Sequence, residues 1–234
     1  MSADFAAALR AAARPVVMEV KRQDADGREL LGGRTVAEVV AAYEAAGAPC
    51  VSVVTGRWFG GTEALLAEVA ALTSLPLLRK DFVTSRGQLR RSRELGASAV
   101  LLTARLLAAG TLERLTEAAL ELGLTPFVEV ADAAEAAAVP YGESCVVAVN
   151  NKDIATGERG AGDLTRGPAL LPAVRATGTG CAVSASGIDG PRTAAGLLDA
   201  GFDGLLIGTG LLTAGSLPEW IARFDRARRG GPGR

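Results

Sequence analysis

The chain has 234 residues and is 49% hydrophobic but only 4% aromatic, so its core must be built mainly from aliphatic side chains. Its 25 Lys and Arg residues nearly balance its 26 Asp and Glu residues, and this lack of a basic excess argues against a nucleic-acid partner. The sequence contains no histidine. Ser-His-Asp triads, histidine bases and histidine metal ligands are therefore excluded.

The cysteines and the N-terminal segment indicate the cellular compartment in which such a chain would function. Cys50, Cys145 and Cys181 lie at wide spacing inside apolar runs, so we interpret them as small buried hydrophobic residues and not as a disulfide framework or zinc site. The N-terminal segment carries Asp4 and Arg10 and lacks the apolar core of a secretory signal. No run approaches the roughly 20 apolar residues of a membrane span. We expect a cytoplasmic protein without a membrane partner.

From the N-terminus, the pattern predicts a short helix over 4–13 and then strands that alternate with helices. The predicted strands cover 16–21, 50–54, 76–80, 98–103, 126–130, 145–149, 181–185 and 203–207. The predicted helices cover 36–46, 62–72, 85–95, 111–122, 132–138, 168–176, 190–200 and 217–228. Two long loops, over 22–34 and 150–167, interrupt this alternation, and residues 229–234 are expected to form a disordered tail.

The strands are mostly continuous apolar runs, which is typical of a parallel sheet buried on both faces. Eight strand–helix units with right-handed crossovers close into a (β/α)8 TIM barrel, and we expect one domain over 1–234. The alternative is an open doubly wound sheet. No GxGxxG segment follows the first strand, which counts against the dinucleotide-binding version of that fold.

Polar side chains gather at the ends of the predicted strands. Glu19 and Lys21 are two residues apart in an extended segment, so their side chains point to the same side. An isolated pair of this kind is more often a surface ion pair. Later apolar runs, however, also end in polar groups, at Lys80, Glu129, Asn150 and Ser186. In a parallel barrel such ends converge at one face, where barrel enzymes have their active sites.

Two glycine-containing segments follow the last two strands. They contribute Ser186 and Gly187 after the seventh strand, and Gly208, Thr209 and Gly210 after the eighth. Glycines let backbone N–H groups approach an anion closely, and TIM barrels often bind phosphate at these two loops. The simpler alternative is that these glycines only permit turns. We favour a phosphate site.

Three of the strand-end residues could carry acid–base chemistry. Burial of Lys80 favours its neutral amine, whereas a nearby carboxylate favours its cationic form. A lysine on which these two effects nearly cancel can act as a general acid. A Schiff-base lysine remains the alternative. Glu129 is the natural general base, unless it only pairs with Lys80 or Lys21. Asn150 could orient the substrate or a carboxylate.

Seven segments resemble the indole-3-glycerol-phosphate synthase family, in the same order and from Asp4 to about Thr213. The segments are Glu19-Val20-Lys21-Arg22, Phe59-Gly60-Gly61, Leu78-Arg79-Lys80-Asp81-Phe82, Val128-Glu129-Val130, Asn150-Asn151-Lys152-Asp153, Ser184-Ala185-Ser186-Gly187-Ile188 and Ile207-Gly208-Thr209-Gly210-Leu211. Each segment is weak alone, but seven in one order are a specific signal.

The resemblance implies a TIM barrel that acts on a small phosphorylated molecule, a carboxyphenylamino-deoxyribulose phosphate. The enzyme closes a five-membered ring with loss of carbon dioxide and water, and needs neither metal nor cofactor. In the family, the residue matching Lys80 is the general acid and the one matching Glu129 is the base. The residue matching Lys21 contacts the substrate carboxylate and is a candidate for the dehydration, while Glu19 and Asn150 support these groups.

The resemblance also implies binding roles. Phe59 and Phe82 would line an aromatic pocket, and Gly187, Gly208 and Thr209 match the phosphate-binding backbone.

Four departures from the family pattern concern the substrate. Asp24 stands near a family serine that binds phosphate, Ala185 replaces a glutamate, and Lys152 replaces an arginine that binds the carboxylate. The helical extension before the first strand is also expected to be shorter. The sequence therefore predicts a divergent member of the family, either monomeric or weakly homo-oligomeric. A related enzyme with a different or non-phosphorylated substrate, and a non-catalytic metabolite-binding barrel, remain as alternatives.

Overall fold

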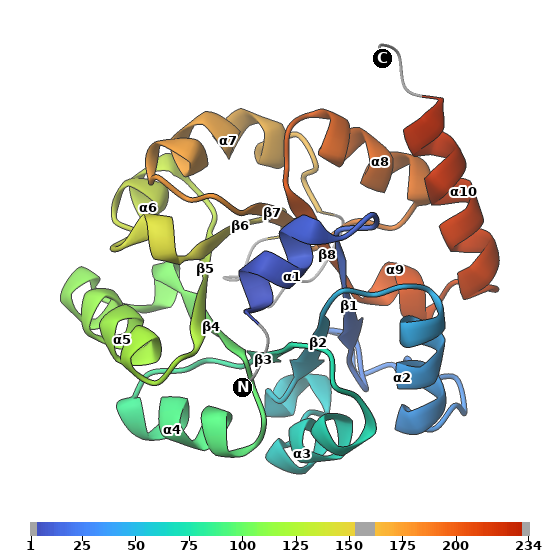
Figure 1. The fold of residues 1–234 in the computed structure, drawn as a ribbon, viewed down its shortest axis with the longest axis horizontal. Coiled ribbons are helices and arrows are strands. Elements are labelled where there is room, and N and C mark those ends of the chain that lie inside the picture. Colours follow the sequence, from blue (N-terminus) through green and yellow to red (C-terminus); the bar gives the residue numbers. More distant parts are fainter. Residues whose placement is uncertain (1–3, 153–161, 231–234) are drawn as a thin grey trace.

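The computed structural model describes residues 4–152 and 162–230 and contains a closed barrel of eight parallel strands. Each strand pairs with its neighbours in sequence, and β1 closes the barrel against β8 (Figure 1). The strands are β1 Val16–Val20, β2 Val51–Val54, β3 Leu77–Lys80, β4 Ala99–Thr103, β5 Thr125–Val130, β6 Val146–Asn150, β7 Ala182–Ala185 and β8 Gly204–Ile207. The predicted (β/α)8 barrel is confirmed, and the open doubly wound sheet is wrong.

Helices surround the barrel on all sides in Figure 1. They are α1 Phe5–Ala11, α2 Val36–Ala45, α3 Glu63–Leu72, α4 Arg86–Glu94, α5 Ala109–Glu121, α6 Ala133–Ala137, α7 Arg166–Ala176, α8 Pro191–Asp199, α9 Thr209–Leu212 and α10 Leu217–Arg229. Short 3-10 helices lie at η1 Arg57–Phe59, η2 Ala104–Leu106 and η3 Gly142–Ser144. Polar N-caps start several of the helices, as at Thr35, whose side chain forms a capping box with Glu38.

The structure adds one helix to the predicted elements and corrects one boundary. The segment after β8 continues into the four-residue helix α9, which was not predicted and whose first turn is closed by hydrogen bonds to the carbonyl of Gly208. Arg229 belongs to α10 and not to a tail. Basic residues in the last turn of α10 interact favourably with its C-terminal carbonyls, which extends the helix. The rest of the expected tail, 231–234, and residues 153–161 of the second long loop lie outside the described residues.

Alternate residues of each strand face the inside of the barrel and the helix layer. On β1, Val17 packs with the interior cluster, whereas Met18 packs with the cluster under the helices.

Helix α1 lies across one end of the barrel (Figure 1), where Phe5 and Leu9 are fully buried. The Phe5 ring packs edge-on against Phe127 at 6.2 Å. Because α1 fills the end at which the strands begin, the opposite, carboxyl end is left for a site.

The three cysteines are buried and unbridged, which confirms the prediction of small buried hydrophobic residues. Burial raises the pKa of the Cys145 and Cys181 thiols to about 12, and it also raises the pKa of Cys50. All three thiols therefore remain protonated near neutral pH.

Within residues 4–152 and 162–230, no helix has both the length and the hydropathy that crossing a membrane requires.

Candidate active site

The five predicted catalytic residues come together at the carboxyl end of the barrel. Glu19 lies on β1 and Lys21 directly after it, Lys80 ends β3, Glu129 lies near the end of β5 and Asn150 ends β6. Each belongs to the row of its strand that faces the barrel interior, because it is an even number of residues from an interior hydrophobic residue such as Val17 or Leu78.

Glu19 lies between the two lysines. Its Oε1 is 3.7 Å from Lys21 Nζ and its Oε2 is 3.6 Å from Lys80 Nζ, while Ser52 Oγ donates a hydrogen bond to Oε2 over 3.4 Å. The Glu19 side chain is only 3% exposed, so its charge needs these cationic partners. One carboxylate thus holds the two lysine side chains near each other.

The end of β1 is anchored from outside the barrel. The buried Tyr43 hydroxyl on α2 donates a hydrogen bond of 2.9 Å to the Glu19 carbonyl. Burial raises the pKa of Tyr43. The phenol therefore stays protonated and keeps its role as donor.

Asn150 orients the second carboxylate. Its Nδ2 donates a hydrogen bond of 3.0 Å to Glu129 Oε1, and its Oδ1 accepts one of 2.9 Å from the backbone N–H of Lys152. Arg166 Nη1 donates to the backbone carbonyls of Asn150 and Lys152. The amide is therefore held at both ends, and the Glu129 carboxylate is presented in one orientation.

A largely apolar cavity of about 300 Å³ opens above these groups. The structure places the predicted binding residues Phe59 and Phe82 in its wall, and Lys21 Nζ lies 5.2 Å from the centre of the Phe59 ring. The lining consists of Lys21, Val54, Gly56, Trp58, Phe59, Lys80, Asp81, Phe82, Leu101, Leu106 and Glu129. Its size and lining suit a planar aromatic group next to a cation.

Two residues at the mouth of this cavity were missed by the sequence analysis. Trp58, in η1, stacks on Phe82 with ring centres 4.7 Å apart and is 52% exposed. Leu106, in η2, is 47% exposed. The signal for Trp58 was present, because it directly precedes Phe59 in a loop at the carboxyl end of a strand, where a large exposed aromatic residue suggests binding.

A second, polar cavity of about 70 Å³ adjoins the first, and Lys21 and Lys80 line both. All the residues predicted to bind phosphate line it, together with Lys152. The lining is Glu19, Lys21, Lys80, Lys152, Ser186, Gly187, Ile188, Asp189, Leu206, Ile207, Gly208, Thr209 and Gly210. The site is therefore one space with an apolar half and a polar half, and the two lysines stand at the boundary.

The chain makes a tight turn after β7, and a buried amide supports it. Ser186 has a φ of +68° and Gly187 a φ of +71°, both in the left-handed region. Asn151 Nδ2 lies 3.0 Å from three acceptors, Ser184 Oγ and the carbonyls of Ala185 and Ser186. Asn151 belongs to the Asn150-Asn151-Lys152-Asp153 segment, whose pattern predicts no role for it. Here it holds the strained turn that forms one wall of the polar cavity.

Close packing explains two of the glycines. A Cβ on Gly208 would overlap the Glu19 carboxylate, and one on Gly210 would overlap the carbonyl of Ile188. Close packing therefore requires both glycines, which is a different reason from the turns that the simpler alternative gave them. It does not conflict with anion binding, because the same lack of side chains leaves the backbone N–H groups accessible.

The lysines of the chain have an unusual distribution. The sequence contains only three, Lys21, Lys80 and Lys152, so the other 22 of its 25 basic residues are arginines. All three lysines line the polar cavity. Lysine can give up its proton when its surroundings favour the neutral amine, whereas arginine stays charged. The site thus holds every ammonium side chain that the protein has.

Asp24, expected near the phosphate, belongs instead to its own loop. Its Oδ1 accepts hydrogen bonds from the backbone N–H groups of Asp26 and Arg28, and its Oδ2 pairs with Arg28 Nε at 3.1 Å. The bond from the Arg28 N–H lowers the pKa of Asp24. Asp24 lines neither cavity. The Ala185 side chain is buried in the barrel interior.

A closed eight-stranded barrel with lysines and carboxylates at the carboxyl ends of its strands defines a TIM barrel with a candidate active site at that face. The family model described as indole-3-glycerol phosphate synthase matches residues 2–224. The chain therefore belongs to the indole-3-glycerol phosphate synthase family, and it is an enzyme of the carboxy-lyase class that acts on a small molecule.

Curated relatives agree with this assignment. Indole-3-glycerol phosphate synthase 1 of Streptomyces coelicolor is 37% identical over 211 residues, which cover 90% of this chain and 77% of that protein. Indole-3-glycerol phosphate synthase of Pyrococcus furiosus is 34% identical over 222 residues, 93% of this chain and 94% of the relative. The tryptophan biosynthesis protein TrpCD of Archaeoglobus fulgidus is 35% identical over 207 residues, but the chain spans only 36% of its length.

Proposed function

We propose that this chain converts a carboxyphenylamino-deoxyribulose phosphate to indole-3-glycerol phosphate, with release of carbon dioxide and water. The observation that carries the proposal is the position of Lys21 and Lys80, held by the shared Glu19 carboxylate at the boundary of the two cavities. An aryl group and a phosphate bound in the two halves would bring the sugar carbonyl between them, next to both ammonium groups.

Substrate binding follows from the chemistry of each half. The aryl ring lies in the apolar cavity between Phe59 and Phe82, where burial of its faces drives binding. The phosphate lies in the polar cavity against the turn at Gly187 and the segment that begins at Gly208, with Lys152 supplying positive charge. The substrate carboxylate, on the ring, is within reach of Lys21.

Ring closure needs a proton donor at the carbonyl. The ring carbon that bears the carboxylate attacks the carbonyl carbon, and Lys80 donates a proton to the oxygen, which becomes a hydroxyl group. Loss of carbon dioxide then returns the bonding electrons to the ring and restores its aromaticity. The hydroxyl leaves as water when Lys21 protonates it, while Glu129 removes a proton from the new five-membered ring to complete the indole.

Two lines of reasoning favour this substrate over a different or non-phosphorylated one. The hydrogen bonds of Asp24 within its own loop remove the main reason to expect exclusion of a phosphate. A relative over most of this chain is named a tryptophan biosynthesis protein, so we assign the reaction to tryptophan synthesis. We further propose that the enzyme acts in the cytoplasm as one barrel domain, monomeric or weakly homo-oligomeric.

The direct test is to incubate the purified protein with the carboxyphenylamino-deoxyribulose phosphate and follow indole fluorescence, with product mass confirmed by mass spectrometry. A folded protein that forms no indole product would reject the proposal.

The three lysines permit a second test. Acetylation with acetic anhydride converts amines to amides but leaves arginines unmodified, so among the basic side chains it should reach only the site lysines. We expect inactivation that saturating substrate prevents. Full activity after complete acetylation of Lys80 would argue against its role as acid, because the acetylated nitrogen carries no charge and cannot donate a proton as an ammonium group does.

A further inference from the structure

Arg79 is a buried charged residue outside the two cavities. It precedes Lys80 on β3, and strand alternation directs it away from the barrel interior, into the layer between β3 and the helices. Its side chain is only 3% exposed. A guanidinium is rarely buried unless its hydrogen bonds are satisfied. The partners of Arg79 therefore indicate which parts of the structure it joins.

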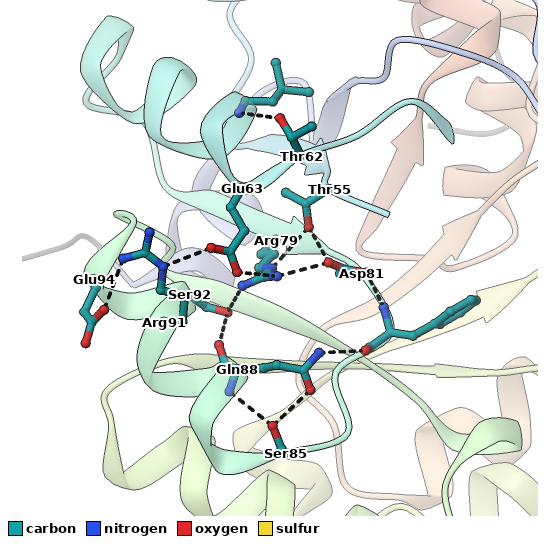
Figure 2. A network of polar contacts seen from close by, with 12 residues as sticks. Thr55, Thr62, Glu63, Arg79, Asp81, Ser85, Gln88, Arg91, Ser92 and Glu94 are labelled. Carbon is teal, nitrogen blue, oxygen red and sulfur yellow. Dashed lines mark hydrogen bonds and ion pairs between the residues drawn. The ribbon is translucent and has the colours of Figure 1, made fainter. Parts of the chain in front are cut away.

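Figure 2 shows the contacts of this guanidinium with four side chains, three of them from other segments of the chain. Nε donates to Thr55 Oγ1 over 3.1 Å, and Nη1 reaches Ser92 Oγ on α4 at 3.4 Å. Nη2 lies 3.0 Å from Asp81 Oδ2 and 3.2 Å from Glu63 Oε1 on α3. Arg79 therefore ties the ends of β2 and β3 to each other and to both following helices.

Thr55 and Asp81 complete a closed triangle with Arg79. The Thr55 hydroxyl accepts from Arg79 and donates to Asp81 Oδ2 over 2.7 Å. Both residues also form hydrogen bonds with the backbone around the site. The Thr55 N–H donates to the Lys80 carbonyl over 3.0 Å. Asp81 Oδ1 accepts from the Phe82 N–H over 2.9 Å. We call Thr55, Arg79 and Asp81 the outer triangle.

The outer triangle is continuous with the wall of the apolar cavity. Phe82, whose N–H it holds, stacks on Trp58 at 4.7 Å. Trp58 follows Thr55 by three residues, so both members of the aromatic stack are attached to the triangle through short pieces of chain. Lys80 lies between Arg79 and Asp81. Any rotation of this segment would move the ammonium group and the Phe82 ring together.

We propose that Arg79 and Thr55 are positioning residues for the reaction, which act through Lys80 and Phe82 without touching the substrate, and that they do so together with Asp81, which also lines the apolar cavity. The inference rests on the proposed function, because Lys80 is the acid only if the ring closure occurs here. The physical basis is pre-organisation: a fixed acid and a fixed ring wall avoid reorganisation in the transition state, and a displacement of about 1 Å can cost on the order of 10²-fold in rate. A buried charge with four partners makes this segment stiffer than an apolar packing would.

The test compares two substitutions of Thr55, which lines neither cavity. Thr55→Ser keeps the hydroxyl, and Thr55→Val keeps the shape but removes the hydroxyl and leaves Arg79 Nε and Asp81 each without one partner. We expect Thr55→Val to lower kcat about 10- to 100-fold, and Thr55→Ser to stay within about threefold of the parent. Arg91→Gln is the matched control, because Arg91 binds the other oxygen of Glu63 at 3.0 Å but lies on the surface.

A spectroscopic measurement separates positioning from a loss of overall stability. In a Trp220→Phe background, Trp58 is the remaining tryptophan. A loosened Phe82 should increase acrylamide quenching of Trp58 in Thr55→Val at temperatures well below its Tm, but not in Thr55→Ser or Arg91→Gln. If Thr55→Val does not fold, Thr55→Ala replaces it, because it also removes the hydroxyl, with the same expectation.

The outcomes distinguish the inference from the proposed function. An inactive parent protein would reject the proposed function, and the quenching comparison would still test the coupling of the triangle to Trp58. An active parent with equal kcat in Thr55→Val and Thr55→Ser would overturn the inference and leave the proposed function standing. Equal loss of kcat in Arg91→Gln would also overturn it, because the effect would then belong to the surface ion pair.

Discussion

The Asn150 side-chain amide donates a 3.0 Å hydrogen bond to Glu129 Oε1 inside the barrel, where both residues are buried. The bond comes from the neighbouring strand, since β6 pairs with β5 in parallel and Glu129 lies opposite Ala148, two residues before Asn150. Because the amide oxygen is occupied by the Lys152 N–H, the amide cannot turn over without losing a bond. The carboxylate is therefore presented to the cavity in a defined orientation.

Glu129→Gln should keep substrate binding and lose rate. The amide preserves the shape of the side chain but has no basic oxygen, so we expect kcat to fall about 10²- to 10⁴-fold with KM changed little. The pH profile of the parent should show an acidic limb that is absent from the variant. Identical limbs in parent and variant would assign the base to another group.

Lys80→Ala should abolish turnover, with kcat lowered by at least about 10²-fold, because the ring closure loses its proton donor. The barrel should remain folded, since Lys80 lies at the cavity and not in the packed interior. Arg86→Ala is a suitable control, because it removes a cationic side chain from the surface ion pair with Glu121. Indole formation in Lys80→Ala at a rate near that of the parent would exclude Lys80 as the acid.

Asp24→Ser should change KM by less than about twofold. The carboxylate is paired with Arg28 and lines neither cavity, so a phosphate bound at Gly187 and Gly208 does not face it. Initial rates at low and high salt provide the measurement. A KM that falls markedly in the variant, with a difference that shrinks as salt is raised, would show that Asp24 does repel the phosphate.

A pH-dependent contribution to stability is expected where α10 meets the chain before β1. Arg14 binds Asp225 through two hydrogen bonds, of 2.9 and 2.8 Å, and these lower the pKa of Asp225. A carboxyl whose pKa is depressed by folding stabilises the fold above its unfolded pKa of about 3.9, and this contribution is lost as the pH falls through the folded value.

Asp225→Asn should therefore lower the free energy of unfolding at pH 7 by on the order of 0.5–1 kcal/mol, since the pair is partly exposed. The difference from the parent should shrink as the pH falls below about 4. Urea unfolding at both pH values measures it. Asp199→Asn, on the exposed side of α8, is the control. A difference independent of pH would mean that the carboxylate charge is not what stabilises this contact.

Some of the site residues could be predicted because strand geometry is periodic. A period of two places Glu19 and Lys21 on one side of β1, and the apolar runs before Lys80, Glu129 and Asn150 mark each of them as a strand end. Parallel strands have their ends at one face, so the gathering of these groups needed no knowledge of individual contacts.

Other residues could not be predicted, because their roles depend on contacts between distant segments. Arg79 belongs to the same apolar run as Lys80, and three of its partners, Thr55, Glu63 and Ser92, come from other segments of the chain. The role of Asn151 depends on its reach across to the turn after β7. The loop position of Trp58 suggests binding, but its stack on Phe82 joins two loops that the sequence does not show to be in contact.

The sequence by itself determined the barrel, the face that holds the site and the chemical groups available there. It did so because hydrophobic alternation and strand order are local or sequential properties of the chain. Only the tertiary structure decided that Glu19 reaches past Ser52 on β2 to bind both Lys21 and Lys80, and that Asp24 turns into its own loop. The Glu19 contacts depend on the pairing of β1 and β3 with the two edges of β2, and the Asp24 contacts depend on side-chain hydrogen bonds within one irregular loop. No periodic pattern along the chain specifies either set.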